Sequence, residues 1–167
     1  MAVVCRGPFA GCKINNMNTP IIDMDLSEQA PHSPRERIGG FAIACRAVDK
    51  CRASLAGTPG EYRFDCPLDQ RLFSFKGITG DQFKAAVKVA KNYDEVGAWL
   101  LANGTAKTAP EIEDWSDDME AASPIKNPEK RDHFIEECHR LGLNPDKTTT
   151  FAWLEADDRF SFRSATE

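Results

Sequence analysis

Residues 33–57 read SPRERIGGFAIACRAVDKCRASLAG, and this stretch has the pattern of one long helix. Ser33 and Glu36 form a capping-box pattern with a proline at the first helical position, a combination that is typical of a helix N-terminus. Gly57 can adopt the left-handed conformation that ends many helices. The stretch therefore predicts one long helix from Ser33 to about Ala56.

The apolar residues of this stretch recur every three or four positions, so they form one broad face of the predicted helix. That face consists of Ile38, Phe41, Ala42, Cys45, Val48, Leu55 and Ala56. The adjacent residues Gly39 and Gly40 weaken a helix by about 1 to 2 kcal/mol relative to two alanines. We therefore expect another part of the chain to approach the backbone closely at these two glycines.

Helix signals recur at short intervals through the rest of the chain. Capping residues followed by helically spaced apolar residues begin near Asp65, Thr79, Asp94, Thr108, Asn127 and Pro145. The one strand candidate, residues 61–64, cannot form a sheet by itself. The sequence predicts an all-α fold, a compact single-domain helical bundle with one long N-terminal helix and about six shorter helices. Its core is expected to include Trp99, Trp115, Trp153, Phe41, Phe73, Phe83 and Phe134.

The composition excludes several classes of protein. The chain has 167 residues, of which 41% are hydrophobic and 28% charged, and these values are typical of one globular domain. The net charge of -5 argues against generic nucleic-acid binding, because such binding needs a broadly basic surface. No apolar stretch approaches the roughly 20 residues that a membrane-spanning helix requires, so no membrane association is predicted.

The N-terminal residues differ from the rest of the chain, because the first sixteen show no helical or alternating pattern. We expect residues 1–22 to be a flexible N-terminal tail or an over-extended translation start, and residues 23–163 to form the single helical domain. The N-terminus lacks the apolar region of a secretory signal, which predicts a cytoplasmic location. In that compartment the six cysteines are expected to be free thiols.

Four motifs follow one another in the first half of the chain, namely SPRE at 33–36, DKCRA at 49–53, GEY at 60–62 and CPLDQ at 66–70. In these motifs the chain resembles a bacterial domain-of-unknown-function family of small cytoplasmic proteins, whose members read similarly through PRSPRE, DKARA, GEY and CPLDQ. The resemblance extends from about Asp23 to Phe162. It implies a single-domain fold and transfers no catalytic residue. It also implies that neither Cys51 nor His32 is essential, because many members have alanine and arginine at these positions.

Two charged residues, Asp49 and Arg52, fall on the apolar side of the long predicted helix when residues are placed at about 100° intervals. A buried charge without a partner costs several kcal/mol, so Arg52 is expected to pair with Asp49 or with an acid from another segment, of which Asp65 and Asp69 in the following loop are nearest. Such a pair is interpreted either as a structural ion pair or as a guanidinium that holds a carboxylate or phosphate ligand.

Cys66 stands directly before Pro67 at a predicted helix start, where free amides and the helix dipole favour a thiolate. Asp65 and Asp69 are anionic neighbours that oppose thiolate formation, and no histidine is near in sequence. Cys66 is therefore interpreted either as a structural core residue or as a nucleophile, with Asp65 and Asp69 as candidates for proton transfer.

The sequence predicts no metal site and no cofactor. Glu136 and His139 form the half-motif of di-iron carboxylate bundles, but this motif occurs once, and the chain has only three histidines and no HExxH. The acidic residues between Glu111 and Glu120 are interpreted as a solvated helix face. The glycine-rich loops of nucleotide-binding proteins and the elbow motif of serine hydrolases are also absent.

Two functions are compatible with these features. The leading hypothesis is a pocket between the long helix and the CPLDQ segment that binds or acts on an anionic small metabolite. Its ligand-binding residues would be Arg52 and Asp49, and its catalytic residues Asp65, Cys66 and Asp69. The alternative is a non-catalytic module that contacts a protein partner. A cavity beside Arg52 would favour the pocket, and an exposed apolar patch on the order of several hundred Å² would favour the module.

Overall fold

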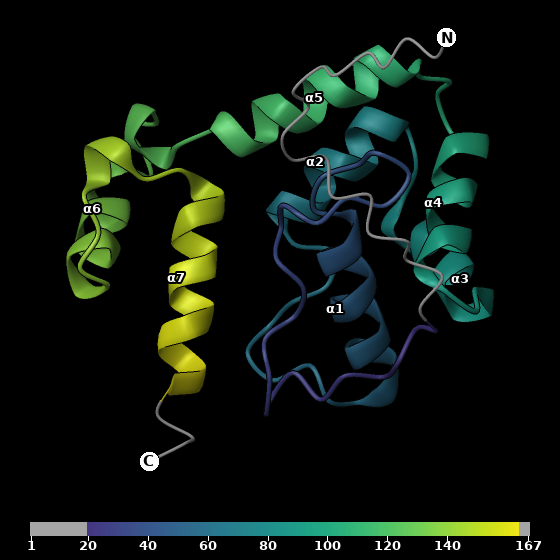
Figure 1. Cartoon of the computed structure of the whole chain (residues 1–167), viewed down its shortest axis with the longest axis horizontal. Coiled ribbons are helices and arrows are strands. Elements are labelled where there is room, and N and C mark those ends of the chain that lie inside the picture. The colour runs from purple at the N-terminus through teal and green to yellow at the C-terminus, as the bar shows by residue number, and fades with distance from the viewer. Residues whose placement is uncertain (1–19, 164–167) are drawn as a thin grey trace, which may run out of the picture.

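The computed structural model describes residues 20–163, and within this range the fold consists of helices and contains no β-strand (Figure 1). The seven α-helices are α1 (Ala44–Ala56), α2 (Pro67–Lys76), α3 (Gly80–Val89), α4 (Tyr93–Ala102), α5 (Ala109–Ala121), α6 (Arg131–Arg140) and α7 (Thr150–Arg163). Two short 3₁₀ helices, η1 (Pro124–Lys126) and η2 (Pro145–Lys147), precede and follow α6. The predicted all-α fold is confirmed, and the strand candidate at 61–64 forms an irregular loop. Most of the predicted N-terminal tail lies outside the described residues.

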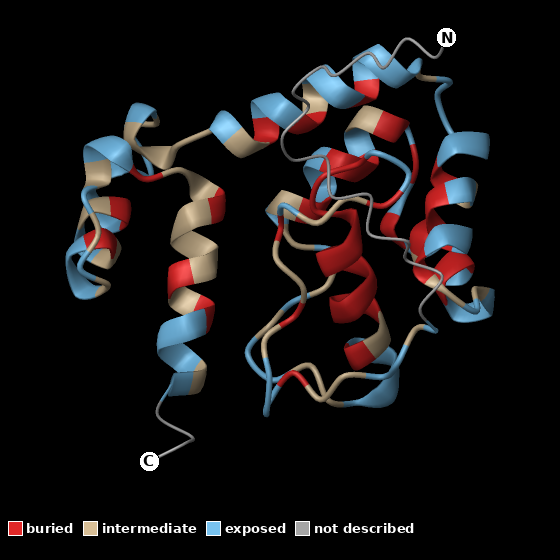
Figure 2. Ribbon diagram, viewed as in Figure 1, coloured by how far each residue is buried: buried red, intermediate tan, exposed pale blue. Residues whose placement is uncertain are grey.

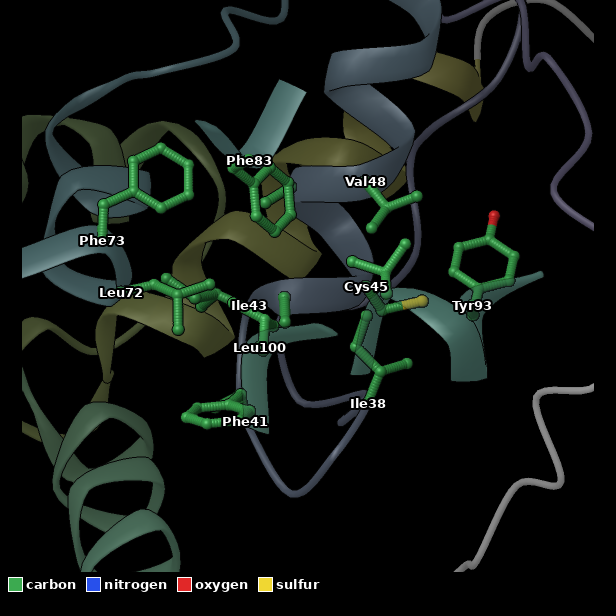
Figure 3. Packing of buried hydrophobic residues seen from close by; sticks show 14 of the residues in the cluster. Ile38, Phe41, Ile43, Cys45, Val48, Leu72, Phe73, Phe83, Tyr93 and Leu100 are labelled. Carbon is green, nitrogen blue, oxygen red and sulfur yellow. The ribbon is translucent and has the colours of Figure 1, made fainter. Parts of the chain in front are cut away.

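α1 is the central helix, and nine of its 13 residues are buried (Figure 2). Its apolar side chains pack against α2, α3 and α4. Figure 3 shows Cys45 and Val48 of α1 in one cluster with Phe73, Phe83 and Leu100, which come from these three helices. α1 is therefore enclosed by the fold and does not lie on its surface with one face exposed.

The predicted long helix is wrong at its N-terminal end, because α1 begins at Ala44 and not at Ser33. Gly39, Gly40 and Ile43 have φ values of 58°, 87° and 60°, which lie outside the right-handed helical region. The chain therefore turns repeatedly between residues 33 and 43 before it enters the helix.

The predicted capping box at Ser33 is also wrong. The Ser33 hydroxyl donates a hydrogen bond of 2.5 Å to the carboxylate of Glu155 in α7. The Ser33 oxygen also accepts from the Arg35 N–H at 3.2 Å, so the local contact forms a turn and not a helix start.

The predicted close approach at the glycine pair is confirmed. A Cβ atom on Gly39 would lie 2.9 Å from the carbonyl oxygen of Gly97 in α4. A Cβ atom on Gly97 would in turn lie 2.8 Å from the backbone nitrogen of Gly39. The turn before α1 therefore contacts the backbone of α4 directly, and this contact needs glycine at both Gly39 and Gly97.

Local signals placed most of the shorter helices correctly. The predicted capping boxes that begin at Thr79 and Thr108 start α3 and α5. Gly57 ends α1 in a left-handed conformation, as predicted. α6 begins at Arg131, because the predicted start at Asn127 forms a turn first.

The aromatic residues predicted for the core fall into two groups. The phenylalanines are fully buried, and they are Phe41, Phe73, Phe83 and Phe134. The tryptophans are only partly buried, and they are Trp99, Trp115 and Trp153. Trp99 and Trp115 pack on the edge of the main core, whereas Trp153 packs edge-on against Phe134 with ring centroids 5.5 Å apart.

The segment at residues 20–31 lies along the helical body as an arm. Its Ile21 N–H donates to the carbonyl of Lys91 at 3.1 Å, and its Leu26 N–H donates to the carbonyl of Thr58 at 3.0 Å. Leu26 is buried. The arm therefore covers part of the surface next to α1.

α5 extends from the helices around α1 toward the pair formed by α6 and α7 (Figure 1). α7 contacts α5, and its Phe151 belongs to the main core. No helix among the described residues has the length and apolar character that a membrane span requires.

Candidate functional site

A cleft of about 950 Å³ lies between α1, the loop at residues 60–66 and α7. The wall on the α1 side consists of Leu26, Ser27, Arg46, Lys50, Gly60, Glu61, Tyr62, Arg63, Cys66 and Leu68. The opposite wall consists of Glu137, Arg140, Leu154, Asp157, Asp158, Phe160, Ser161 and Phe162. The cleft therefore separates the central helix from the C-terminal helices, and many of its lining residues are charged.

An ion pair between Arg46 and Asp158 crosses the cleft. The two guanidinium nitrogens Nη1 and Nη2 donate to the two carboxylate oxygens at 2.7 and 3.1 Å. The Tyr62 hydroxyl donates to the same carboxylate at 2.7 Å, and the guanidinium lies 5.4 Å from the Tyr62 ring centroid. Burial and the neighbouring carboxylate both raise the pKa of Tyr62, so its hydroxyl stays protonated as a donor.

A second cation, Lys50, lies deeper in the same wall. Its ammonium donates to both carboxylate oxygens of Asp69 at 2.8 and 2.9 Å and to the Sγ of Cys66 at 3.3 Å. Only 5% of the Lys50 side chain is exposed. Cys66 is the N-cap residue of α2, and its side chain makes no capping hydrogen bond. Lys50, Cys66 and Asp69 therefore form one connected group next to the cleft.

Asp65 belongs to the same loop but faces another element. Its backbone N–H donates to Asp69 at 3.0 Å, which supports the position of that carboxylate. Its own carboxylate accepts from the Gln70 side chain and lies against Gly80 at the start of α3, where a Cβ atom would be 2.6 Å away. Asp65 has a φ of 60°, which costs energy for a residue other than glycine. It does not line the cleft.

Arg52 is not where the helical pattern placed it. Its Nε donates to Asp23 of the N-terminal arm at 2.8 Å, and 22% of its side chain is exposed. The prediction that Arg52 pairs with an acid from another segment is confirmed, but that acid is Asp23 and not Asp65 or Asp69. The physical reason is that the arm covers this side of α1 and supplies the partner. Arg52 does not line the cleft.

Asp49 is fully buried and binds two different residues. Its Oδ2 accepts from the backbone N–H of His32 at 2.7 Å and contacts the ring Nδ1 of His32 at 2.6 Å, and its Oδ1 accepts from the Tyr93 hydroxyl at 2.6 Å. The hydrogen bond to Asp49 raises the pKa of His32. Burial, together with Asp49, raises the pKa of Tyr93. Asp49 is therefore predicted correctly as a buried acid, but its partners are not the predicted ones.

The described residues contain one group of three side chains that could share a metal ion, His32, Glu36 and Cys45. Their ligand atoms all lie within 4.8 Å of one another. The half-motif of Glu136 and His139 is exposed on α6, as expected for surface charge.

Sequence reasoning missed two buried cations that border the cleft, Arg46 and Lys50. Both fall outside the apolar face of the predicted helix, and the local acid, Asp49, binds His32 and Tyr93 instead. The acids that bind them lie 112 positions away at Asp158 and 19 positions away at Asp69. The two cations are four positions apart and therefore lie on one helix face, and this spacing was the only signal in the sequence that could have grouped them.

These features define a small all-α protein with a charged cleft between its central and C-terminal helices. The chain belongs to the family described as Domain of unknown function (DUF5069), which matches residues 28–160. This match confirms the resemblance to a domain of unknown function. No curated protein matches the chain.

Proposed function

We propose that the cleft binds an anionic small molecule and that the Cys66 thiol is the group placed to react with it. Four cationic side chains border the cleft, namely Arg46, Lys50, Arg63 and Arg140. Arg63 is exposed and forms no ion pair among the described residues, so its guanidinium is available to a carboxylate or a phosphate. The cytoplasmic location predicted from the sequence is part of this proposal.

The contact between Lys50 and Cys66 carries the proposal. The Lys50 ammonium donates to Sγ at 3.3 Å, and Cys66 is the N-cap residue of α2, so a cation and a helix N-terminus both lie beside the thiol. Asp69 accepts two hydrogen bonds from the same ammonium and therefore acts as a positioning group rather than as a proton carrier. Thiols with a cation and a helix N-terminus beside them are typical of nucleophilic cysteines.

The proposal changes the roles that the sequence suggested. Arg52 and Asp49 take no part in it, because their contacts lie outside the cleft. Arg46 and Lys50 are the buried cations of the cleft instead. Asp65 supports Asp69 through its backbone and has no direct role.

A module that binds a protein partner is the second candidate. The observation that favours it is a set of exposed large hydrophobic side chains, which are Ile22, Leu55, Val89, Leu101 and Phe160. Burial of such side chains against a partner would stabilise a complex. Phe160 also lines the cleft, so the two candidates share one residue.

Competition with cysteine alkylation tests the proposal. Iodoacetamide is expected to label the partly buried Cys66 in the native chain, and the buried thiols of Cys45, Cys51 and Cys138 serve as internal references. Pyrophosphate, citrate and glycerol phosphate are the anionic probes, and uncharged glycerol is the control. At least one anionic probe is expected to slow the labelling of Cys66 and to raise the melting temperature, because a ligand stabilises the state that binds it.

Two arginine variants show whether the probe lies in the cleft. Arg63→Gln is expected to weaken the protection about tenfold, the loss expected for one charge-assisted hydrogen bond. Arg52→Gln is the matched control, because its partner Asp23 lies outside the cleft. Absence of protection by every anionic probe, or equal weakening in the two variants, would contradict the proposal and favour the protein-binding module.

A further inference from the structure

Three metal-ligating side chains lie together at the start of α1, and none of them lines the cleft. A ring nitrogen of His32, a carboxylate oxygen of Glu36 and the Sγ of Cys45 lie within 4.8 Å of one another. Imidazole, carboxylate and thiolate are the ligand types that Zn²⁺ binds in proteins. Cys45 is buried and the other two residues are partly buried, so this group differs from an exposed cluster of acids.

His32 is fixed in position by contacts on several sides. Its backbone N–H donates to Asp49 at 2.7 Å, and its carbonyl accepts from Arg46 at 3.2 Å. Two residues of α1 therefore bind the backbone of His32. Its ring lies edge-on to Tyr93 with centroids 5.3 Å apart, and its Nδ1 contacts Asp49 at 2.6 Å. Histidine ligands of metal ions usually bind a carboxylate through the second ring nitrogen in this way.

Among the described residues, no lysine or arginine pairs with the acids of this group. The Glu36 carboxylate forms no hydrogen bond or ion pair with any described residue. The Asp49 carboxylate is fully buried, and its partners are His32 and Tyr93 rather than a lysine or arginine. Cys45 and Tyr93 lie on the same side of the core in Figure 3. Two acids, one thiol and one imidazole therefore lie in one region, where a divalent cation would balance the negative charge of the two carboxylates.

We propose that His32, Glu36 and Cys45 bind one Zn²⁺ ion, with Asp49 orienting the imidazole. The Nδ1 of His32 binds Asp49, and its Nε2 forms no hydrogen bond with a described residue. Three protein ligands leave a fourth position for water, which is the arrangement of zinc sites that act on a bound molecule. The proposal replaces the sequence prediction that the chain holds no metal ion, and it does not depend on the function proposed for the cleft.

The required movement is small. Metal–ligand distances near 2.0 to 2.3 Å place neighbouring ligand atoms roughly 3.3 to 3.8 Å apart, so the group closes by about 1 Å when the ion binds. Glu36 can make this adjustment, because no other contact holds its carboxylate.

Cobalt substitution tests the proposal in the full chain. The reduced protein is stripped with EDTA and titrated with Co²⁺, and native mass spectrometry with Zn²⁺ gives the stoichiometry. One equivalent of metal is expected, with a thiolate-to-cobalt charge-transfer band in the near ultraviolet. Cys45→Ser should abolish this band. His32→Gln and Glu36→Gln should each weaken the affinity by at least about 10- to 100-fold, the loss that is typical of removing a residue that only supports a ligand. Glu36→Gln changes a partly exposed side chain that no described residue binds.

Cysteine controls identify the thiolate. Cys51→Ser removes another buried cysteine of α1 outside the group, and a Cys5→Ser/Cys12→Ser double variant removes the N-terminal thiols. Both controls are expected to keep the band. The proposal is overturned if the parent binds no stoichiometric Co²⁺, or if the band survives Cys45→Ser. Should Cys45→Ser not fold, parental affinity in both His32→Gln and Glu36→Gln would overturn it.

Discussion

The two sides of α1 are held by different forces. Toward α2, α3 and α4 the helix contacts fully buried apolar side chains such as Phe73, Phe83 and Leu100. Toward α7 it reaches across through the ion pair of Arg46 with Asp158. Apolar side chains pack to the density of a solid and leave no room, whereas the ionic side borders a cleft of about 950 Å³. The comparison teaches that fold stability and the candidate site lie on opposite sides of one helix.

The largest effect is expected on the apolar side. Phe73→Ala should lower the free energy of unfolding by about 3 to 5 kcal/mol, because it removes a fully buried ring and leaves a cavity. Chemical denaturation measures this change. Phe160→Ala is the control, since 51% of that residue is exposed and its loss should have little effect. Equal losses of stability in the two variants would contradict the burial of Phe73 in the core.

A smaller loss is expected on the ionic side when one partner is removed. Asp158→Ala should cost about 3 kcal/mol, because Arg46 remains buried without its carboxylate and Tyr62 loses its acceptor. Asp157→Ala is the matched control, since this neighbouring acid pairs with Arg140 at the surface and should change stability little. A thermal melt of both variants compares them. If Asp158→Ala melts like Asp157→Ala, the ion pair does not join α7 to α1.

The smallest effect is expected at Arg52, outside both sides of this comparison. Arg52→Met should cost less than about 1 kcal/mol, because the ion pair with Asp23 is partly exposed. Denaturation of the variant checks this value. A loss as large as that of Asp158→Ala would instead support the buried pairing that the sequence pattern suggested.

The parts of the fold that depend on neighbouring residues could be predicted from the sequence. The capping boxes at Thr79 and Thr108 and the helix end at Gly57 involve contacts within a few positions, and all three are confirmed. No helix starts at Ser33, although its oxygen accepts from the Arg35 N–H at 3.2 Å, and its hydroxyl donates to Glu155 of α7. Positive φ values at Gly39 and in the residues that follow also break the helical path.

The candidate site was harder to predict, because most of its contacts join residues that are far apart in the sequence. Cys66 before Pro67 is a local signal, and its position at the start of α2 is confirmed. Arg46 and Lys50 find their acids across long stretches of chain, so no spacing in the sequence reveals the pairs. The helical pattern chose Arg52 because it assumed a helix with one covered face, whereas α1 is covered on most sides.

The ion pair between α1 and α7 is expected to serve ligand binding rather than stability, and one double variant tests this directly. Arg46→Met/Asp158→Leu replaces the buried pair by apolar side chains of similar size, a change that is often neutral or stabilising by about 1 to 4 kcal/mol. We expect a melting temperature equal to or above that of the parent, together with loss of the protection of Cys66 by the anionic probe. A double variant that melts well below the parent, or that keeps full protection of Cys66, would contradict this assignment.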